Sequence, residues 1–112
     1  MQFQLTIDCA DLDRMTAFYA AALGYVPKGA AAQYASMVAA DGAGPKLVFQ
    51  RVDEPKVVKN RMHLDLIVDD IEAEAARFVS LGATRGESFA ELGIHWIAMH
   101  DPEGNEVCLC DS

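Results

Sequence analysis

The sequence predicts an α+β fold built from two copies of one strand, helix, three-strand module. Two observations carry this prediction. Alternating apolar and polar residues mark a strand before each of two amphipathic helices. The acidic helix caps Asp11 and Asp70 lie 59 residues apart, and the glycines that end the helices, Gly24 and Gly82, lie 58 residues apart. A shared spacing of this kind indicates an internal duplication with two copies.

The first copy begins with FQLTIDC, residues 3–9, where apolar and polar side chains alternate. Asp11 has N-cap character, and apolar residues at spacings of three and four follow it until Gly24 ends the helix. Three short strands are then predicted, at residues 25–28, 33–40 and 45–52. The glycine-rich segment 41–44 is the predicted turn between the last two.

The second copy repeats this order. The predicted strand 61–68, RMHLDLIV, precedes a helix that is capped by Asp70 and ended by Gly82. Three further strands are predicted, at residues 83–87, 94–100 and 105–110. The turn DPEGN at 101–105 joins the last two, because Asp-Pro starts such turns and Gly and Asn accept left-handed conformations.

The predicted organisation is a single domain over residues 1–112. Module one covers about 1–53 and module two about 61–112. The charged, proline-containing segment 54–60 is the predicted linker between them.

The charge and composition exclude several classes of function. Seventeen acidic residues against nine basic ones give a net charge of −8, which repels nucleic acids and anionic membranes. No apolar run approaches the ~18 residues that cross a bilayer, and the N-terminus does not resemble a signal peptide, so we expect a cytoplasmic protein. The three cysteines lack a paired spacing, and we expect reduced thiols.

The stretch MHLDLIV contains the first candidate site residues. Alternation along a strand places His63 and Asp65 on the face opposite the apolar row. By the repeat, Gln4 and Thr6 are their counterparts in module one. In the last strand of each module, Gln50 and Cys108 lie opposite the apolar residues. Four equivalent positions are therefore predicted to point away from the helices: Gln4, Gln50, His63 and Cys108.

Three segments in order, LTIDCADLDRMTAFYAAALGY, MHLDLIVDDIEAEAARFVSLGA and HDPEGNEVCLC, resemble the vicinal oxygen chelate superfamily. The resemblance is to its small glyoxalase-like domains, of the glyoxalase, bleomycin resistance and dioxygenase type. It implies two βαβββ modules that form an eight-stranded cup around a small-molecule site, with the helices on the outer face. It also implies metal ligands from the first and last strands of both modules, at Gln4, Gln50, His63 and Cys108.

The ligand set departs from the two His and two Glu common in that family. Two amides and a thiol supply no carboxylate for octahedral Mg²⁺, Mn²⁺ or Fe²⁺, whereas zinc accepts Cys and His. Asp65 lies two positions along its strand from His63, and Glu106 lies two positions from Cys108, a distance of about 7 Å by strand rise. This distance argues against either carboxylate sharing an ion with the candidate ligand on its strand. No cofactor is therefore expected, although a divalent Zn, Ni, Mn or Fe ion stays possible.

Three functions remain open. The first is metal-free binding of a small molecule, by a lining expected to comprise Gln4, Thr6, Gln50, His63, Asp65, Trp96 and Cys108. The second is a metal-dependent lyase, isomerase or dioxygenase, and the third a metal-free enzyme that uses His63 and Asp65 as an acid/base pair. The plainer alternatives are a structural histidine, a solvated aspartate and a small buried thiol. We expect a homodimer, because each module leaves strand edges unpaired.

Overall fold

The computed structural model describes residues 1–111, which form two units. Unit 1 is Met1–Pro55, and unit 2 begins at Lys56. Unit 1 contains β1 (Gln4–Cys9), α1 (Leu12–Leu23), β2 (Tyr25–Ala31), β3 (Tyr34–Ala39) and β4 (Lys46–Arg51). Unit 2 contains β5 (Leu64–Ile67), α2 (Ile71–Ser80), β6 (Thr84–Glu91), β7 (Ile94–His100) and β8 (Glu106–Cys110).

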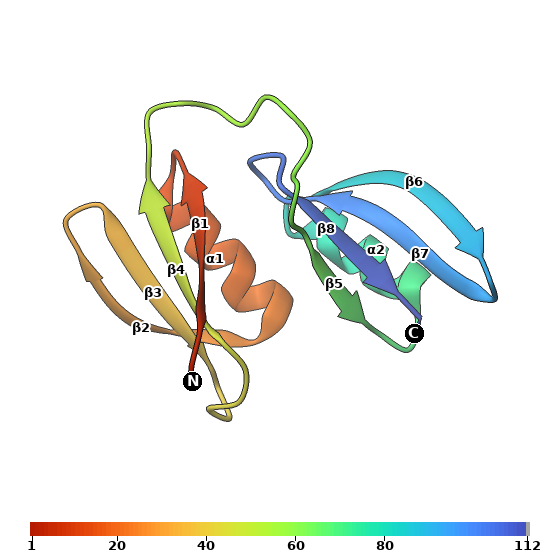
Figure 1. The fold of residues 1–112 in the computed structure, drawn as a ribbon, viewed down its shortest axis with the longest axis horizontal. Coiled ribbons are helices and arrows are strands. Elements are labelled where there is room, and N and C mark those ends of the chain that lie inside the picture. The colour runs from red at the N-terminus through yellow and green to blue at the C-terminus, as the bar shows by residue number, and fades with distance from the viewer. Residues whose placement is uncertain (112) are drawn as a thin grey trace. The chain divides into compact units, whose positions relative to one another are not determined.

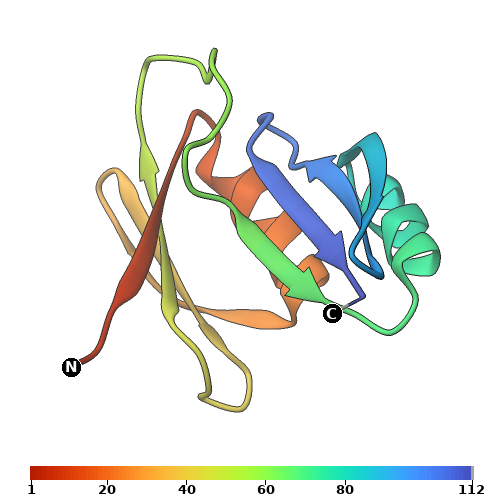
Figure 2. The ribbon, with the colours of Figure 1, turned by 45° about the vertical axis from the view of Figure 1, so that its right-hand side comes forward.

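Each unit has one four-stranded sheet and one helix. The strand order is β1-β4-β3-β2 in unit 1 and β5-β8-β7-β6 in unit 2. The first and last strands of each unit pair in parallel, and the other pairs are antiparallel. Figures 1 and 2 show that each helix covers one face of its own sheet. The predicted α+β fold with two βαβββ modules and eight strands is confirmed.

Both helix starts and the end of α1 are those that the sequence predicts, whereas α2 ends at Ser80 with Leu81 as its C-cap, one residue before Gly82. The Asp11 side chain accepts a hydrogen bond from the Arg14 N–H at 3.0 Å, and Asp70 accepts one from the Ala73 N–H at 3.0 Å. Gly24 ends α1 with a φ of 71°, a left-handed conformation that favours glycine. The two aspartates therefore satisfy backbone donors that a helix start otherwise leaves unpaired.

The core of each unit lies between its helix and its sheet. In unit 1 the Tyr19 and Phe49 rings pack with centroids 5.4 Å apart, and both side chains are buried. In unit 2 Phe78 and Ala75 from α2 are buried over the sheet. The sheet residues buried on this side are Met37 and Leu47 in unit 1, and Ile97, Met99, Val107 and Leu109 in unit 2.

The strand bounds differ from the prediction in two ways. The hairpin strands β2 and β6 are longer, since they run to Ala31 and Glu91. The strand β5 is shorter, because its ladder with β8 begins only at Leu64 paired with Val107. His63, predicted to be within this strand, therefore lies immediately before it.

Within residues 1–111, neither helix is both long and apolar enough to cross a membrane.

Candidate functional site

The candidate site lies on the face of the unit 2 sheet opposite α2, here called the front face. In the parallel ladder Asp65 pairs with Cys108, so both side chains point to the same side of the sheet. Their neighbours in sequence, Leu64 and Leu109, belong to the other face, where Leu109 is fully buried. The alternation that the sequence predicts for this strand pair is confirmed.

Three side chains converge on the front face. His63 Nδ1 lies 2.7 Å from Asp65 Oδ1, and the donor atoms of His63, Asp65 and Cys108 all lie within 4.8 Å of one another. The His63 and Asp65 side chains are 36% and 53% exposed, whereas the whole of Cys108 is 9% exposed. The expectation that Asp65 lies too far along the strand is wrong, because strand rise spaces backbone atoms while these side chains lean toward each other.

The Cys108 thiol is held in its neutral form. Burial raises its pKa above the ordinary value of 9.0, and the nearby Asp65 carboxylate raises it further. A protonated thiol is a poor nucleophile, so Cys108 is not poised for covalent catalysis in this state.

Glu106 is engaged elsewhere. Its Oε2 accepts a hydrogen bond from the Asn60 N–H at 3.0 Å and forms an ion pair with Lys56 Nζ at 3.3 Å. Burial alone would raise the pKa of this carboxyl, but these hydrogen bonds and the Lys56 charge lower it below its ordinary value of 4.5. Glu106 therefore fastens the segment before β5 to β8, and its carboxylate is not directed at the His63 cluster.

An aromatic pair extends the front face. Trp96 pairs with Cys110 across β7 and β8, and its ring stacks on Phe89 with centroids 5.2 Å apart and 19° between the planes. Phe89 is 41% exposed. Sequence reasoning named Trp96 but missed Phe89, because the predicted strand stopped at residue 87, before it.

Unit 1 does not bring its predicted site residues together. Gln4 pairs with Lys46 and Gln50 pairs with Asp8, so the two glutamines lie four ladder positions apart, or about 13 Å by strand rise. A metal ion cannot bridge that distance. Within unit 1, Gln4 and Gln50 are not a ligand pair.

The expected equivalence of Gln50 and Cys108 also shifts. Thr6 paired with Val48 matches Asp65 paired with Cys108, since the aligned ladder residues differ by 59 in the first strands and by 60 in the last. The cause is length. The strands β6 and β7 have 8 and 7 residues, against 7 and 6 in β2 and β3, while the turn before the last strand is one residue shorter, 101–105 against 40–45. An apolar valine therefore occupies the position in unit 1 that Cys108 occupies in unit 2.

A second histidine–aspartate pair lies at the ends of β7 and β8. His95 Nδ1 is 3.0 Å from Asp111 Oδ2, and the His95 backbone N–H donates to Asp111 Oδ1 at 3.0 Å. These hydrogen bonds lower the pKa of the Asp111 carboxyl. His95 alternates with Trp96 and so belongs to the opposite face. This pair fastens two strand ends.

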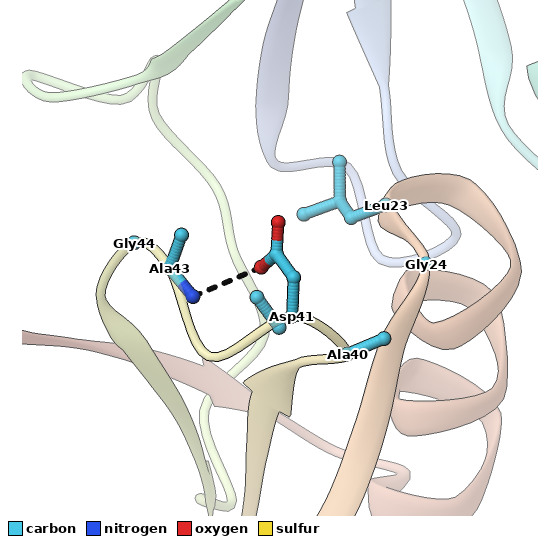
Figure 3. A pocket seen from close by; sticks show the side chains of 7 residues that line it. Leu23, Gly24, Ala40, Asp41, Ala43 and Gly44 are labelled. Carbon is cyan, nitrogen blue, oxygen red and sulfur yellow. Dashed lines mark hydrogen bonds between the residues drawn. The ribbon is translucent and has the colours of Figure 1, made fainter.

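A shallow depression of about 440 Å³ lies in unit 1. It is lined by the end of α1 and the turn between β3 and β4, where Asp41 accepts a hydrogen bond from the Ala43 N–H (Figure 3). The other residues that line it are leucine, alanine and glycine. It contains none of the predicted site residues.

The glyoxalase-like domain family profile matches residues 4–110. The chain belongs to this family. No curated protein sequence matches it.

Solved structures of this family share the fold of the chain. The fosfomycin resistance protein FosX from Mesorhizobium loti is 17% identical, with a TM-score of 0.76 over 100% of this chain and 92% of that one. FosX from Listeria monocytogenes is 14% identical, with a TM-score of 0.80 over 98% and 91%. A glyoxalase/bleomycin resistance protein/dioxygenase family enzyme from Burkholderia phytofirmans is 15% identical, with a TM-score of 0.76 over 96% and 94%.

The resemblance noted in the sequence implies a divalent metal ion, and the donors on the front face of unit 2 show which ion would fit. Its donors are an imidazole nitrogen, a carboxylate oxygen and a sulfur, the only such group of three or more within residues 1–111. This set fits zinc, which accepts all three donor types in a four-coordinate site. It does not fit Mn²⁺ or Mg²⁺, which prefer six mostly oxygen donors.

Proposed function

We propose that this glyoxalase-like domain binds a small molecule on the front face of unit 2, without a hard octahedral metal ion. The observation that carries the proposal is the cluster of His63, Asp65 and Cys108 beside one another on a sheet face opposite the helix. Polar side chains on such a face add nothing to the helix-side core. They are available instead to bind a ligand.

The chemistry of the face indicates the class of ligand. His63 and Asp65 are partly exposed and can exchange hydrogen bonds with a ligand. The stacked Trp96 and Phe89 rings offer apolar contact along the same face. A small molecule with an aromatic or other flat apolar part and a polar group suits this combination. The contributions of Gln4, Thr6 and Gln50 stay predictions.

The solved relatives support small-molecule binding by this fold. A variant of FosX from Listeria monocytogenes, 15% identical to this chain, is a complex with Mn(II) and 1S,2S-dihydroxypropylphosphonic acid. That ligand is a small polar molecule, although it has no aromatic part. The Mn(II) ion is not carried over to this chain, because the chain's cluster of His63, Asp65 and Cys108 is not a donor set that Mn(II) prefers.

A thermal-shift screen of small molecules against the chelator-treated protein tests the proposal. We expect at least one polar aromatic compound to raise the melting temperature in a concentration-dependent way, since a ligand that binds only the folded state stabilises it. A screen that finds stabilising compounds only after divalent metal is added back would contradict metal-free binding.

One contact favours a second candidate, acid/base catalysis. The 2.7 Å contact between His63 and Asp65 can fix the orientation and tautomer of the imidazole, as a general base requires. Turnover of a bound compound that is lost in Asp65→Asn, with binding retained, would support this activity. Binding without turnover in the wild type would leave ligand capture as the function.

A further inference from the structure

We infer that Glu106 is a positioning residue for the front-face site, because it holds in place the chain segment that leads into His63. The inference rests on the proposed function, in which the His63 imidazole contacts the bound molecule. Glu106 itself is not a member of the cluster of His63, Asp65 and Cys108. It acts on the site through the position of His63.

The backbone before His63 is not fixed by strand pairing. The ladder between β5 and β8 begins at Leu64 paired with Val107, so Asp65 lies inside it and His63 lies before it. Residues 53–63 form neither a helix nor a strand. The position of His63 therefore depends on other contacts that this segment makes.

Apolar packing does not hold the segment. Its large apolar side chains are 84%, 76% and 81% exposed, at Val57, Val58 and Met62 respectively. Side chains that remain in water contribute little to fixing the chain that carries them. The segment must therefore be held by polar contacts.

Glu106 provides those contacts. Its Oε2 accepts a hydrogen bond from the Asn60 N–H at 3.0 Å and pairs with Lys56 Nζ at 3.3 Å. The side chains of Lys56 and Glu106 are both mostly buried, so water competes less for these contacts than it does at the surface. Asn60 precedes His63 by only three residues, which span at most ~10 Å of chain. A shift at Asn60 is therefore passed on to His63.

The histidine has little room for such a shift. Its Nδ1 lies 2.7 Å from Asp65 Oδ1. An ionised carboxylate only accepts hydrogen bonds, so Nδ1 carries the proton and Nε2 of the neutral ring remains an acceptor for a bound molecule. A displacement of His63 by about 1 Å would lengthen the contact beyond hydrogen-bond distance and release the ring from this tautomer.

Unit 1 lacks the equivalent contact. Lys46 occupies the position that matches Glu106, where it pairs with Gln4 across β1 and β4. A lysine side chain has no acceptor for a backbone N–H. The unit that carries the polar cluster is therefore also the unit in which a carboxylate holds the segment before the first strand.

The test is a long-range ¹H–¹⁵N correlation spectrum of the full, chelated, ¹⁵N-labelled chain at about pH 8, where an ordinary imidazole is neutral. The signals of His63 are those that are missing from His63→Ala. We expect the wild type to show one His63 tautomer, with the proton on Nδ1. Glu106→Ala should show a mixture of both tautomers at His63, while the His95 signals stay unchanged.

Three further variants separate the hydrogen bond from the ion pair. Asn60→Pro removes the donor N–H and should change the His63 signals as Glu106→Ala does. Glu106→Gln keeps an oxygen acceptor for Asn60, and Lys56→Ala removes only the charged partner. Both should keep the wild-type tautomer, which a general loss of stability would not explain.

Two results would overturn the inference. One is an unchanged His63 tautomer in folded Glu106→Ala or, if that variant does not fold, in Asn60→Pro. The other is a Glu106→Gln variant whose His63 signals move as far as those of Glu106→Ala. The spectra are recorded without any bound molecule, so they decide the role of Glu106 separately from whether the front face captures a ligand.

Discussion

The two units share one plan and differ on one face. Both place a capped helix over a four-stranded sheet, with buried aromatic and aliphatic side chains between them. On the other face, unit 2 pairs Asp65 with Cys108 beside His63, whereas unit 1 pairs Thr6 with Val48 at the matching positions. The helix side keeps the module folded, and the front face is where the two copies differ in chemistry.

The two faces of each sheet are constrained differently. A closely packed core tolerates few changes, so both copies retain large apolar residues there. A sheet face that does not contribute to that core is free to change. One unit of a duplicated fold can therefore acquire a cluster of polar side chains on this face, while both units retain the same packed core.

The largest expected effects test whether the two cores are equally important. Phe49 in unit 1 is 0% exposed and Phe78 in unit 2 is 2% exposed. Replacing either one with Ala should lower the free energy of unfolding by about 3 to 5 kcal/mol, through lost burial and a cavity. Urea denaturation of both variants measures this, and a cost below about 1 kcal/mol for only one of them would break the comparison.

The turns before the last strands, unlike the two cores, are expected to contribute unequally to stability, with the larger contribution in unit 2. Asp101 is buried and accepts hydrogen bonds from the Glu103 and Asn105 N–H groups and from the Asn105 amide. Asp101→Ala should cost about 2 to 3 kcal/mol, because these donors lose their acceptor. Asp41→Ala, in the exposed turn of unit 1, should cost less than about 1 kcal/mol. Equal costs in chemical denaturation would contradict the difference.

The pH dependence of stability tests a contact that unit 2 has and unit 1 lacks, between Glu106 and the segment before β5. The pKa of Glu106 is lowered in the folded chain, so its contribution to stability is present above the ordinary value of 4.5 and is lost as pH falls through the folded-state pKa. In unit 1, Lys46 occupies the matching position.

Glu106→Gln should therefore be less stable than the wild type at pH 7, by roughly 1 kcal/mol, and should match it near pH 3. The measurement is the urea midpoint across this range. A difference that persists unchanged at low pH would show that the charge of Glu106 is not the cause.

The smallest expected effect is at the surface of unit 2. Arg85 Nη1 lies 2.6 Å from Glu72 Oε2 in an ion pair between β6 and α2, with side chains 39% and 67% exposed. Water and salt weaken such pairs, so Arg85→Ala should leave the urea midpoint unchanged within error at about 0.15 M salt. A clear loss of stability would mean that this pair supports unit 2 in a way that burial does not indicate.

Much of the fold could be predicted because local signals repeat. The acidic caps Asp11 and Asp70, the glycine after α1 and the alternation around Asp65 each have a local physical cause. Hairpin length has no such signal. The last strands match at a spacing of 60 residues, two more than the 58 of the expected repeat. The sequence therefore matched Cys108 with Gln50, whereas the ladders match it with Val48.

The site was predictable in part for the same reason. His63 and Asp65 could be assigned to one face from alternation alone, but their 2.7 Å contact depends on side-chain rotation that strand spacing does not report. The Trp96–Phe89 stack depends on where β6 ends. The engagement of Glu106 by Lys56 and Asn60 spans more than forty residues of chain, which no local pattern encodes.

The most direct test of the central claim is a calorimetric titration of a ligand found in the screen against three chelated proteins: the wild type, His63→Ala and His95→Ala. Both histidines contact an aspartate, at 2.7 and 3.0 Å, but only His63 belongs to the front-face cluster. His63→Ala should fold normally and bind about 1 to 3 kcal/mol more weakly, the cost of a lost polar partner, while His95→Ala binds as the wild type does. Equal affinity in His63→Ala and the wild type, or failure of His63→Ala to fold, would contradict the claim that the front face of unit 2 is the binding site.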